Sequence, residues 1–323
     1  MSKPAGSLVI WTFGDVRIGI ENQLAGLAEA IGEMIPATCR TFTAPKPTLF
    51  SRFTATKPLP DMQAPWPDIA IGCGRASLPF LIAMRRWSAG KTLSVQLQAP
   101  AKPLHLFDLV IAPAHDNLAG DNVLSIIGST NRVSPQKLSA AKDEFAAKID
   151  ALTGSKLAVV LGGNSKRHKL TKAKFQQLCA DLQAILDDGT ALMISTSRRT
   201  PELAKQVLQQ KFGDKENVWL WTDVKQHGDN PYFAFLAAAD SVLVTSDSTN
   251  LLTEAASAAK PVLMLRLDGK DGKFSQLYES LKTRNNMQEF TGSFTSWPVE
   301  PLAETRRAAE EVLRRFHNHL NKP

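Results

Sequence analysis

The sequence has few cysteines and no long apolar run. Its three cysteines, Cys39, Cys73 and Cys179, lie far apart, with no CxxC pair and no nearby group of histidines. This spacing suggests neither a disulfide framework nor a zinc site, and it favours a reducing cytosol. No apolar run approaches the roughly 18 residues of a membrane span. The N-terminal residues 1–16 predict a first strand rather than a signal peptide, so we expect a cytoplasmic protein.

The sequence also has no concentrated block of charge. The formal charge of +7 is spread over both halves of the chain, whereas nucleic-acid-binding proteins usually gather basic residues in a patch or tail. We therefore expect no nucleic-acid partner. An anionic small substrate or an anionic surface fits this charge balance better.

What the chain does contain is a regular alternation of two kinds of segment. Short apolar runs bounded by Gly, Pro or Asp are typical of parallel strands buried on both faces, and amphipathic segments of helical length separate many of them. The apolar runs include 7–11, 68–72, 93–98, 109–113, 157–163, 191–196, 217–221, 241–246 and 261–265. The alternation predicts an α/β protein with parallel sheets.

The length of 323 residues suits two domains of about 150 residues each. A fresh strand opens at Leu157 after a charged helical region, which predicts Rossmann-like domains at 1–150 and 151–301 that face a cleft. We expect residues 302–323 to form a helix that packs back toward the first domain. Its arginines leave open a second interpretation, contact with an anionic membrane.

Ligands of open parallel sheets bind beyond the carboxyl ends of the strands. After the apolar run 241–246 come Asp247, Ser248, Thr249 and Asn250, and then a helix whose N-terminal end suits an anion such as phosphate. An ordinary N-cap needs only one of these side chains. Helical geometry places Glu254 about 160° from the core-facing Leu252. It is either a solvated surface residue or an acceptor for ligand hydroxyls such as those of ribose.

Two more loops of the second half combine glycines, hydroxyls and cations. Residues 162–169 (GGNSKRHK) suit a phosphate but lack the Walker A spacing, and residues 195–201 (STSRRTP) place two arginines before a helix. The predicted nucleotide-binding residues are Gly162, Gly163, Asn164, Ser165, Lys166, Ser197, Arg198, Arg199, Ser248, Thr249, Asn250 and Glu254.

Strand-end loops of the first half supply a second set of candidates. The predicted catalytic residues are Asp15, Glu21, His115 and Asp116, which are acids or a possible acid–base histidine. A structural role for His115 stays open. The predicted substrate-binding residues are Gly19, Asn22, Gln23, Gly74, Arg75 and Gln98.

Several stretches together resemble the family named after the plant mitochondrial-fission factor Elm. They are GDVRIGIENQLAGLAEAIG, PDIAIGCGRAS, FDLVIAPAHDNLAGDNV, LGGNSK, STSRRTP and VTSDSTNLLTEAASAAKPV. The resemblance implies the two-domain GT-B architecture, with a nucleotide sugar bound mainly by the C-terminal domain and the acceptor by the N-terminal domain. It also implies that Glu254 holds ribose and that GGNSK lies beside the phosphates.

The chain departs from that pattern at the first helix. Similar enzymes often carry a glycine-rich turn with histidine there, whereas Gly19 is followed by Ile20. The catalytic base therefore stays open, with Asp15 and Glu21 as candidates. The chain has no DxD motif, the usual carboxylate pair for a metal-bound diphosphate, so the resemblance implies chemistry without a metal or another cofactor. Helix N-termini, Lys166, Arg198 and Arg199 would stabilise the leaving-group charge.

Three functions follow from the resemblance. The first is a metal-independent glycosyltransferase that uses a nucleotide-diphosphate sugar and a lipid-linked or cell-envelope acceptor, with peripheral attachment to the inner face of the membrane as an option. The second is a nucleotide-sugar epimerase of the same architecture. The third is a non-catalytic, membrane-associated adaptor. Fold alone does not distinguish them.

Overall fold

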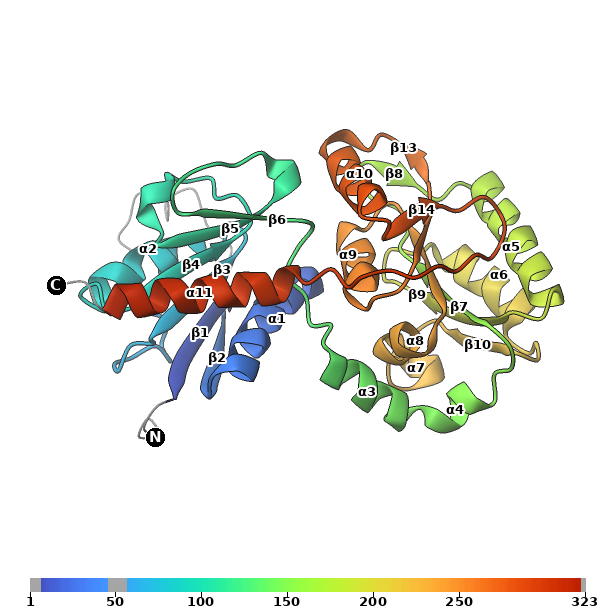
Figure 1. Ribbon diagram of the computed structural model, residues 1–323, viewed down its shortest axis with the longest axis horizontal. Coiled ribbons are helices and arrows are strands. Elements are labelled where there is room, and N and C mark those ends of the chain that lie inside the picture. The colour runs from blue at the N-terminus through green and yellow to red at the C-terminus, as the bar shows by residue number, and fades with distance from the viewer. Residues whose placement is uncertain (1–6, 46–56, 321–323) are drawn as a thin grey trace. The chain divides into compact units, whose positions relative to one another are not determined.

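The computed structural model describes residues 7–45 and 57–320. The chain divides into two compact units (Figure 1): unit 1 comprises Met1–Arg132 and Ala303–Pro323, and unit 2 comprises Val133–Leu302. The division lies after Arg132 rather than near residue 150. The helices between 135 and 150 belong to unit 2, because they precede its first strand and one of them packs on a later helix of that unit.

Unit 1 contains one parallel sheet of six strands in the order β2-β1-β3-β4-β5-β6. The strands are β1 (Leu8–Gly14), β2 (Ala37–Thr43), β3 (Ile69–Cys73), β4 (Leu93–Leu97), β5 (Leu109–Pro113) and β6 (Val123–Ile126). The helices are α1 (Ile18–Met34), α2 (Leu78–Trp87), α11 (Glu304–Leu320) and the short 3-10 turns η2 (Leu104–Leu106) and η3 (Ala114–Asp116).

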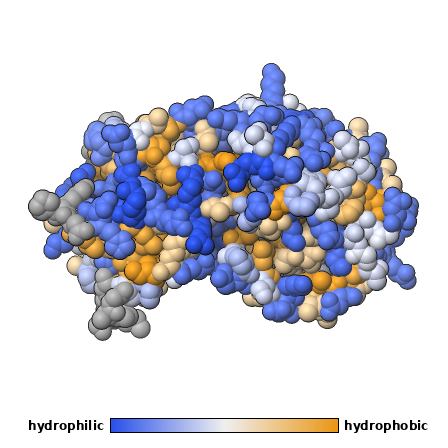
Figure 2. All heavy atoms as spheres, viewed as in Figure 1, coloured by the Kyte–Doolittle hydropathy of each residue, from blue (hydrophilic) through white to orange (hydrophobic). Residues whose placement is uncertain are grey.

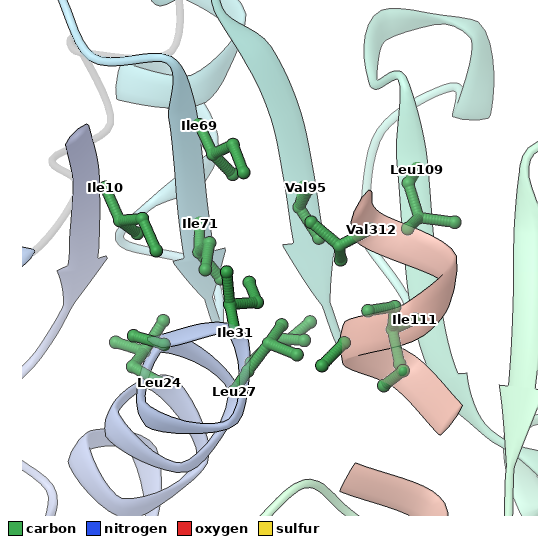
Figure 3. Close-up of a cluster of buried hydrophobic side chains, with 14 of the residues drawn as sticks. Ile10, Leu24, Leu27, Ile31, Ile69, Ile71, Val95, Leu109, Ile111 and Val312 are labelled. Atoms are coloured by element: carbon green, nitrogen blue, oxygen red, sulfur yellow. The ribbon is translucent and has the colours of Figure 1, made fainter. Parts of the chain in front are cut away.

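Apolar side chains cover both faces of this sheet, as the continuous apolar runs predict. On one face Leu24, Leu27 and Ile31 of α1 pack on isoleucines and valines of the central strands (Figure 3). Val312 of α11 joins the same cluster. The last helix of the chain thus completes a core whose other members precede residue 132.

Unit 2 contains a second parallel six-stranded sheet, in the order β10-β9-β7-β11-β12-β14. Its strands are β7 (Lys156–Leu161), β9 (Ala191–Thr196), β10 (Val218–Trp221), β11 (Ser241–Thr245), β12 (Val262–Leu265) and β14 (Met287–Glu289). A separate two-stranded antiparallel pair joins β8 (His168–Lys169) to β13 (Asp268–Gly269).

Two helices precede the first strand of unit 2, and the others follow its strands along the chain. They are α3 (Pro135–Glu144), α4 (Ala146–Asp150), α5 (Lys172–Asp187), α6 (Glu202–Phe212), α7 (Val224–His227), α8 (Tyr232–Ala238), α9 (Thr249–Ser257), η4 (Gly272–Phe274) and α10 (Ser275–Thr283). The prediction of an α/β protein with two parallel sheets is confirmed.

The C-terminal helix α11 presents its apolar stripe to the core of unit 1. Ala308, Ala309, Val312 and Phe316 are buried, while Leu320 at the end of the stripe is 61% exposed. None of the described helices combines the length and apolarity that a membrane crossing needs.

Candidate functional site

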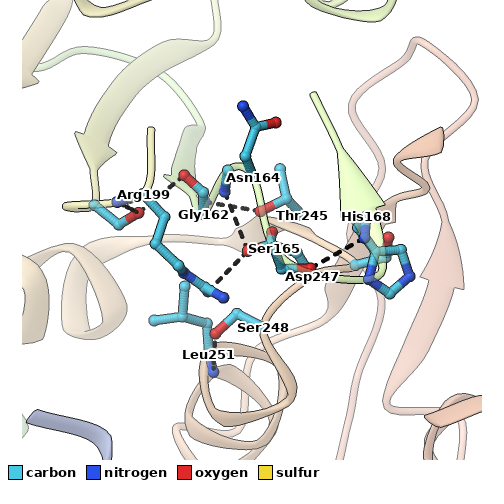
Figure 4. A network of polar contacts seen from close by, with 12 residues as sticks. Gly162, Asn164, Ser165, His168, Arg199, Thr245, Asp247, Ser248 and Leu251 are labelled. Atoms are coloured by element: carbon cyan, nitrogen blue, oxygen red, sulfur yellow. Dashed lines mark hydrogen bonds and ion pairs between the residues drawn. The ribbon is translucent and has the colours of Figure 1, made fainter. Parts of the chain in front are cut away.

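Three adjacent strands of unit 2 end at one cluster of polar residues (Figure 4). The loop after β7 is fixed by the end of β11: the Gly162 N–H donates to Thr245 Oγ1 at 2.8 Å, and the Gly163 N–H donates to Asp247 Oδ2 at 3.1 Å. Ser197, after β9, donates from Oγ to the Gly162 carbonyl at 2.9 Å. The predicted glycine loop is therefore held within the protein through both of its N–H groups.

Gly163 is required at its position by close backbone contact. Its φ is +153°, and a Cβ added there would lie 2.1 Å from the carbonyl oxygen of Arg199. The Asn164 N–H donates to that same carbonyl at 3.2 Å. Glycine at position 163 thus allows the loops after β7 and β9 to approach each other, whereas a Cβ on Gly162 would meet the carboxylate of Asp247 after β11.

Arg199 and Asp247 form the charged centre of this cluster. Arg199 Nη2 lies 2.7 Å from Asp247 Oδ2, and the Asp247 side chain is fully buried while that of Arg199 is 42% exposed. Burying a carboxylate without a partner would be strongly unfavourable, so the ion pair stabilises the buried charge. Because the guanidinium is planar with several donors, its exposed part can still bind an anion.

Asp247 was not among the predicted site residues. Its Oδ1 atom is buried and has no hydrogen-bond partner among the described residues. The available signal was its position directly after a buried strand, where ligand-binding groups of parallel sheets lie. The local sequence gives no indication of its contact with Arg199, which lies 48 positions away in the chain.

The helix α9 begins next to this ion pair. Ser248 is its N-cap, and the Ser248 Oγ accepts from the Leu251 N–H at 3.5 Å. Thr249 and Asn250 form the first turn and are half-buried. The positive end of the helix dipole therefore lies beside the arginine, which makes this corner of unit 2 electrostatically suited to an anion.

Glu254, six residues after the N-cap Ser248, is buried. It is only 6% exposed, and Tyr232 donates its hydroxyl to Glu254 Oε2 at 2.7 Å. The alternative of a solvated surface residue is therefore wrong, because Tyr232 of α8 covers that face of α9, while a role as acceptor for ligand hydroxyls stays a prediction. Burial raises the pKa of Glu254 to about 7, and the hydrogen bond from Tyr232 opposes part of that rise.

The other predicted nucleotide-binding residues divide into two groups. Asn164 and Ser165 are used inside the loop: Asn164 Oδ1 accepts from the Leu170 N–H at 3.0 Å, and Ser165 Oγ accepts from the His168 N–H at 3.0 Å. Lys166 and Arg198 are exposed. The cations near the strand ends thus remain accessible while the smaller polar groups shape the loop.

In unit 1 two of the predicted residues meet directly. The Gln98 Nε2 donates to Gln23 Oε1 at 3.1 Å, and the same oxygen lies 3.6 Å from Cys73 Sγ. Gln98 has a positive φ of +69°. Gln23 is buried in α1, so it links this helix to the ends of β3 and β4.

Asp15 is bound to a neighbouring cation. Arg17 donates to both of its carboxylate oxygens, at 2.8 Å from Nε and 2.7 Å from Nη2. This contact raises the pKa of Arg17. The carboxylate of Asp15 is therefore engaged by a guanidinium through both of its oxygens.

The remaining predicted residues of unit 1 lie apart from this pair. Gly19, Glu21 and Asn22 lie in α1. This helix begins at Ile18, so these three residues are helical and do not belong to a strand-end loop. His115, which is buried, and Asp116 lie in η3 after β5. Gly74 has a φ of +76° and Arg75 beside it is exposed.

Over residues 7–45 and 57–320, no group of three His, Cys, Asp or Glu side chains is arranged to hold a metal ion.

Comparison with known proteins gives a family and a fold. Residues 18–316 match the mitochondrial fission ELM1 family. The mitochondrial fission protein ELM1 of Arabidopsis thaliana is 27% identical over 274 residues, covering 77% of this chain and 64% of the plant protein. An uncharacterized protein of Rickettsia prowazekii, RP120, is 25% identical and covers 97% of this chain and 99% of its own length.

Among solved structures, the UDP-GlcNAc 2-epimerase of Methanocaldococcus jannaschii is similar in fold. It has a TM-score of 0.54 at 11% sequence identity, and the match covers 98% of this chain and 93% of the epimerase.

Proposed function

The chain belongs to the mitochondrial fission ELM1 family, and we propose that its unit 2 binds a nucleoside diphosphate sugar. The observation that carries this proposal is the pairing of two features on one helix. The N-terminus of α9 lies beside the Arg199–Asp247 ion pair, and the buried Glu254 lies six residues further along α9. Six residues of α-helix span about 9 Å. An anion site and a hydroxyl acceptor at that spacing suit the diphosphate and the ribose of one ligand.

The reaction that we propose is transfer of the sugar to a hydroxyl acceptor without a metal ion. Departure of the nucleoside diphosphate leaves negative charge near the start of α9, where the helix dipole, Lys166, Arg198 and Arg199 would stabilise it. A carboxylate of unit 1 would accept the acceptor's proton. Of the two candidates, the exposed Glu21 has no arginine bound to it in the described structure, whereas Asp15 is held by Arg17.

A nucleotide-sugar epimerase is the second candidate function. The likeness in fold to a UDP-GlcNAc 2-epimerase supports the same type of nucleotide site without an acceptor. Both candidates share the proposed binding mode, and they differ only in what happens to the sugar. For the transfer reaction we propose a lipid-linked or cell-envelope hydroxyl compound as the acceptor, reached from the cytoplasmic side.

Calorimetric titration with uridine and guanosine diphosphates in metal-free buffer tests the binding mode. We expect the wild type to bind at least one of them and Glu254→Gln to bind it about tenfold more weakly, because a hydrogen bond to a charged acceptor contributes about 1.5–3 kcal/mol. Glu279→Gln is the matched control, since Glu279 is an exposed glutamate of the same unit. Equal affinities for all three proteins would remove Glu254 from the site. No binding by the wild type would favour the adaptor function.

Incubation with a panel of nucleotide sugars then separates the two reactions. A glycosyltransferase should release nucleotide only when membrane lipid or cell-envelope extract is present. An epimerase should convert the sugar with no acceptor added. Neither change, in a protein that binds nucleotide, would contradict both enzymatic proposals.

A further inference from the structure

The antiparallel pair β8–β13 brings together two basic segments that lie about a hundred residues apart in the chain. Its register pairs His168 with Gly269 and Lys169 with Asp268, and the Lys270 N–H donates to the Arg167 carbonyl at 3.3 Å. Arg167 therefore lies opposite Lys270. We call residues 166–169 and 268–274 together the cationic ribbon.

Alternation along the two strands sorts the ribbon's side chains onto two faces. His168 is 1% exposed and forms the inner face, where its Nε2 lies 3.3 Å from Asp271 Oδ1. Arg167, Lys169 and Lys270 are exposed on the outer face. Asp271 also forms an ion pair with Arg266, a cation outside the ribbon.

The outer face holds three cations and one acid, Asp268, which lies opposite Lys169 and accepts a hydrogen bond from Thr171 Oγ1 at 2.6 Å. Like charges directly opposite each other destabilise a strand pair. Within the described part of the chain, Lys166, Arg167, Lys169 and Lys270 have no carboxylate within ion-pair distance. This arrangement is unfavourable for the isolated protein and would be relieved by an anion.

Glycine and an aromatic ring fix the arginine in this position. A Cβ at Gly272 would lie 2.0 Å from Arg167 Nη1, so glycine leaves room for the guanidinium. The Arg167 Cζ lies 5.5 Å and the Lys273 Nζ lies 6.0 Å from the centroid of the Phe274 ring. The ring of the half-buried Phe274 is thus within cation–π distance of both Arg167 and Lys273.

The C-terminal helix does not offer a comparable surface. Each of its four arginines lies within ion-pair distance of a glutamate of the same helix: Arg306 with Glu310, Arg307 with Glu304, and Arg314 and Arg315 with Glu311. These pairs largely neutralise the charge on which the sequence-based expectation of membrane contact by α11 rested.

We propose that the cationic ribbon is a contact surface for a bilayer that contains anionic phospholipids. The ribbon's cations are exposed and spread over two strands rather than enclosed around one ligand, and hydrophilic colours cover this region of the surface near β8, β13 and α10 (Figure 2). Exposed charges bind a single small anion weakly, whereas an extended anionic surface engages several of them at once. The proposal does not depend on the proposed function.

Vesicle sedimentation with the full-length protein tests this surface. The vesicles are phosphatidylcholine alone or phosphatidylcholine mixed with phosphatidylglycerol, at low and high salt. We expect at least about tenfold stronger binding to the anionic vesicles at low salt, with most of it lost at high salt. Equal binding to both kinds of vesicle, or none, would overturn the proposal and would leave an acidic protein as the alternative partner.

Two double variants with the same change in net charge locate the contact. Arg167→Glu with Lys270→Glu should lose at least about tenfold in binding to anionic vesicles, while Arg306→Glu with Arg314→Glu should retain it. Equal losses in both would mean that overall charge, not the ribbon, drives binding. Arg167→Gln with Lys270→Gln serves if the reversed pair does not fold. Nucleotide titration of each variant reports on the nucleotide site separately.

Discussion

Glu254 illustrates at the residue scale how burial changes the chemistry of a side chain. A glutamate in water is ionised at neutral pH, but inside unit 2 the loss of hydration raises its pKa to about 7. Tyr232 donates the hydrogen bond that keeps the ionised form accessible. A carboxyl poised near neutrality in this way can accept hydrogen bonds from ligand hydroxyls when it ionises.

The raised pKa predicts how stability depends on pH. The folded state binds the Glu254 proton more tightly than the unfolded state, so its stabilising contribution is complete below about pH 4.5 and is lost as the pH rises through about 7. We expect the free energy of unfolding of the wild type, relative to Glu254→Gln, to fall by up to about 3 kcal/mol between pH 4.5 and 8. Urea denaturation over this range measures it.

The exposed Glu279→Gln serves again as the control for that experiment. Its stability should follow the wild type at every pH, because Glu279 is 70% exposed. Parallel curves for the wild type and Glu254→Gln would contradict a buried, proton-binding Glu254.

Helix α1 shows at the element scale how two of the three glycines in one helix can differ in character. Gly26 packs closely against the backbone of Asn131: a Cβ at Gly26 would lie 2.2 Å from the carbonyl oxygen of Asn131. A Cβ added at Gly32 would have no atom within 4 Å apart from the neighbouring backbone of α1 itself. The first glycine is required by packing, while the second only lowers helix propensity.

This contrast predicts opposite effects of one substitution. Gly32→Ala should stabilise the protein by about 0.5–1 kcal/mol, the gain in helix propensity. Gly26→Ala gains the same propensity but forces the helix away from Asn131, and we expect a net loss of about 1–2 kcal/mol. Urea denaturation of the two variants measures both, and a stabilising Gly26→Ala would show that α1 can shift at no cost.

At the scale of the whole molecule, the two units differ in how the chain builds them. Unit 2 is one continuous segment, whereas unit 1 needs α11 from the far end of the sequence. Ala308, Ala309, Val312 and Phe316 of α11 complete the core cluster around α1 and the central strands. The fold of unit 1 therefore depends on residues that follow all of unit 2.

A chain truncated after Leu302 should lose stability in unit 1 alone. Removing α11 exposes the core side chains that it contacts. The lost hydrophobic stabilisation is about 3–6 kcal/mol, a large part of the free energy of unfolding of an ordinary domain. Hydrogen exchange should show faster exchange in peptides of residues 7–45 and 57–132 and unchanged protection in 133–302. Arg306→Glu, a change on the exposed side of α11, should leave both patterns unchanged.

The local sequence predicted the fold class and nine of the twelve strands of the two sheets, because burial on both faces of a parallel strand requires an apolar run that is visible without any partner. It missed the edge strands β2, β6 and β14, whose residues are largely exposed or half-buried. It also directed attention to the loops after β7, β9 and β11, since ligands of such sheets bind at the carboxyl ends of strands. That these loops bind a nucleotide sugar stays a prediction.

Three features depend on contacts between distant residues, and only the tertiary structure decided them. Arg199 reaches Asp247, Tyr232 covers Glu254, and Arg167 lies opposite Lys270. The sequence by itself determined which segments are buried, because hydrophobic periodicity is a local property. The spatial order of the strands in each sheet decided which charged side chains meet. Coulomb interactions and hydrogen bonds act between neighbours in space and not in sequence.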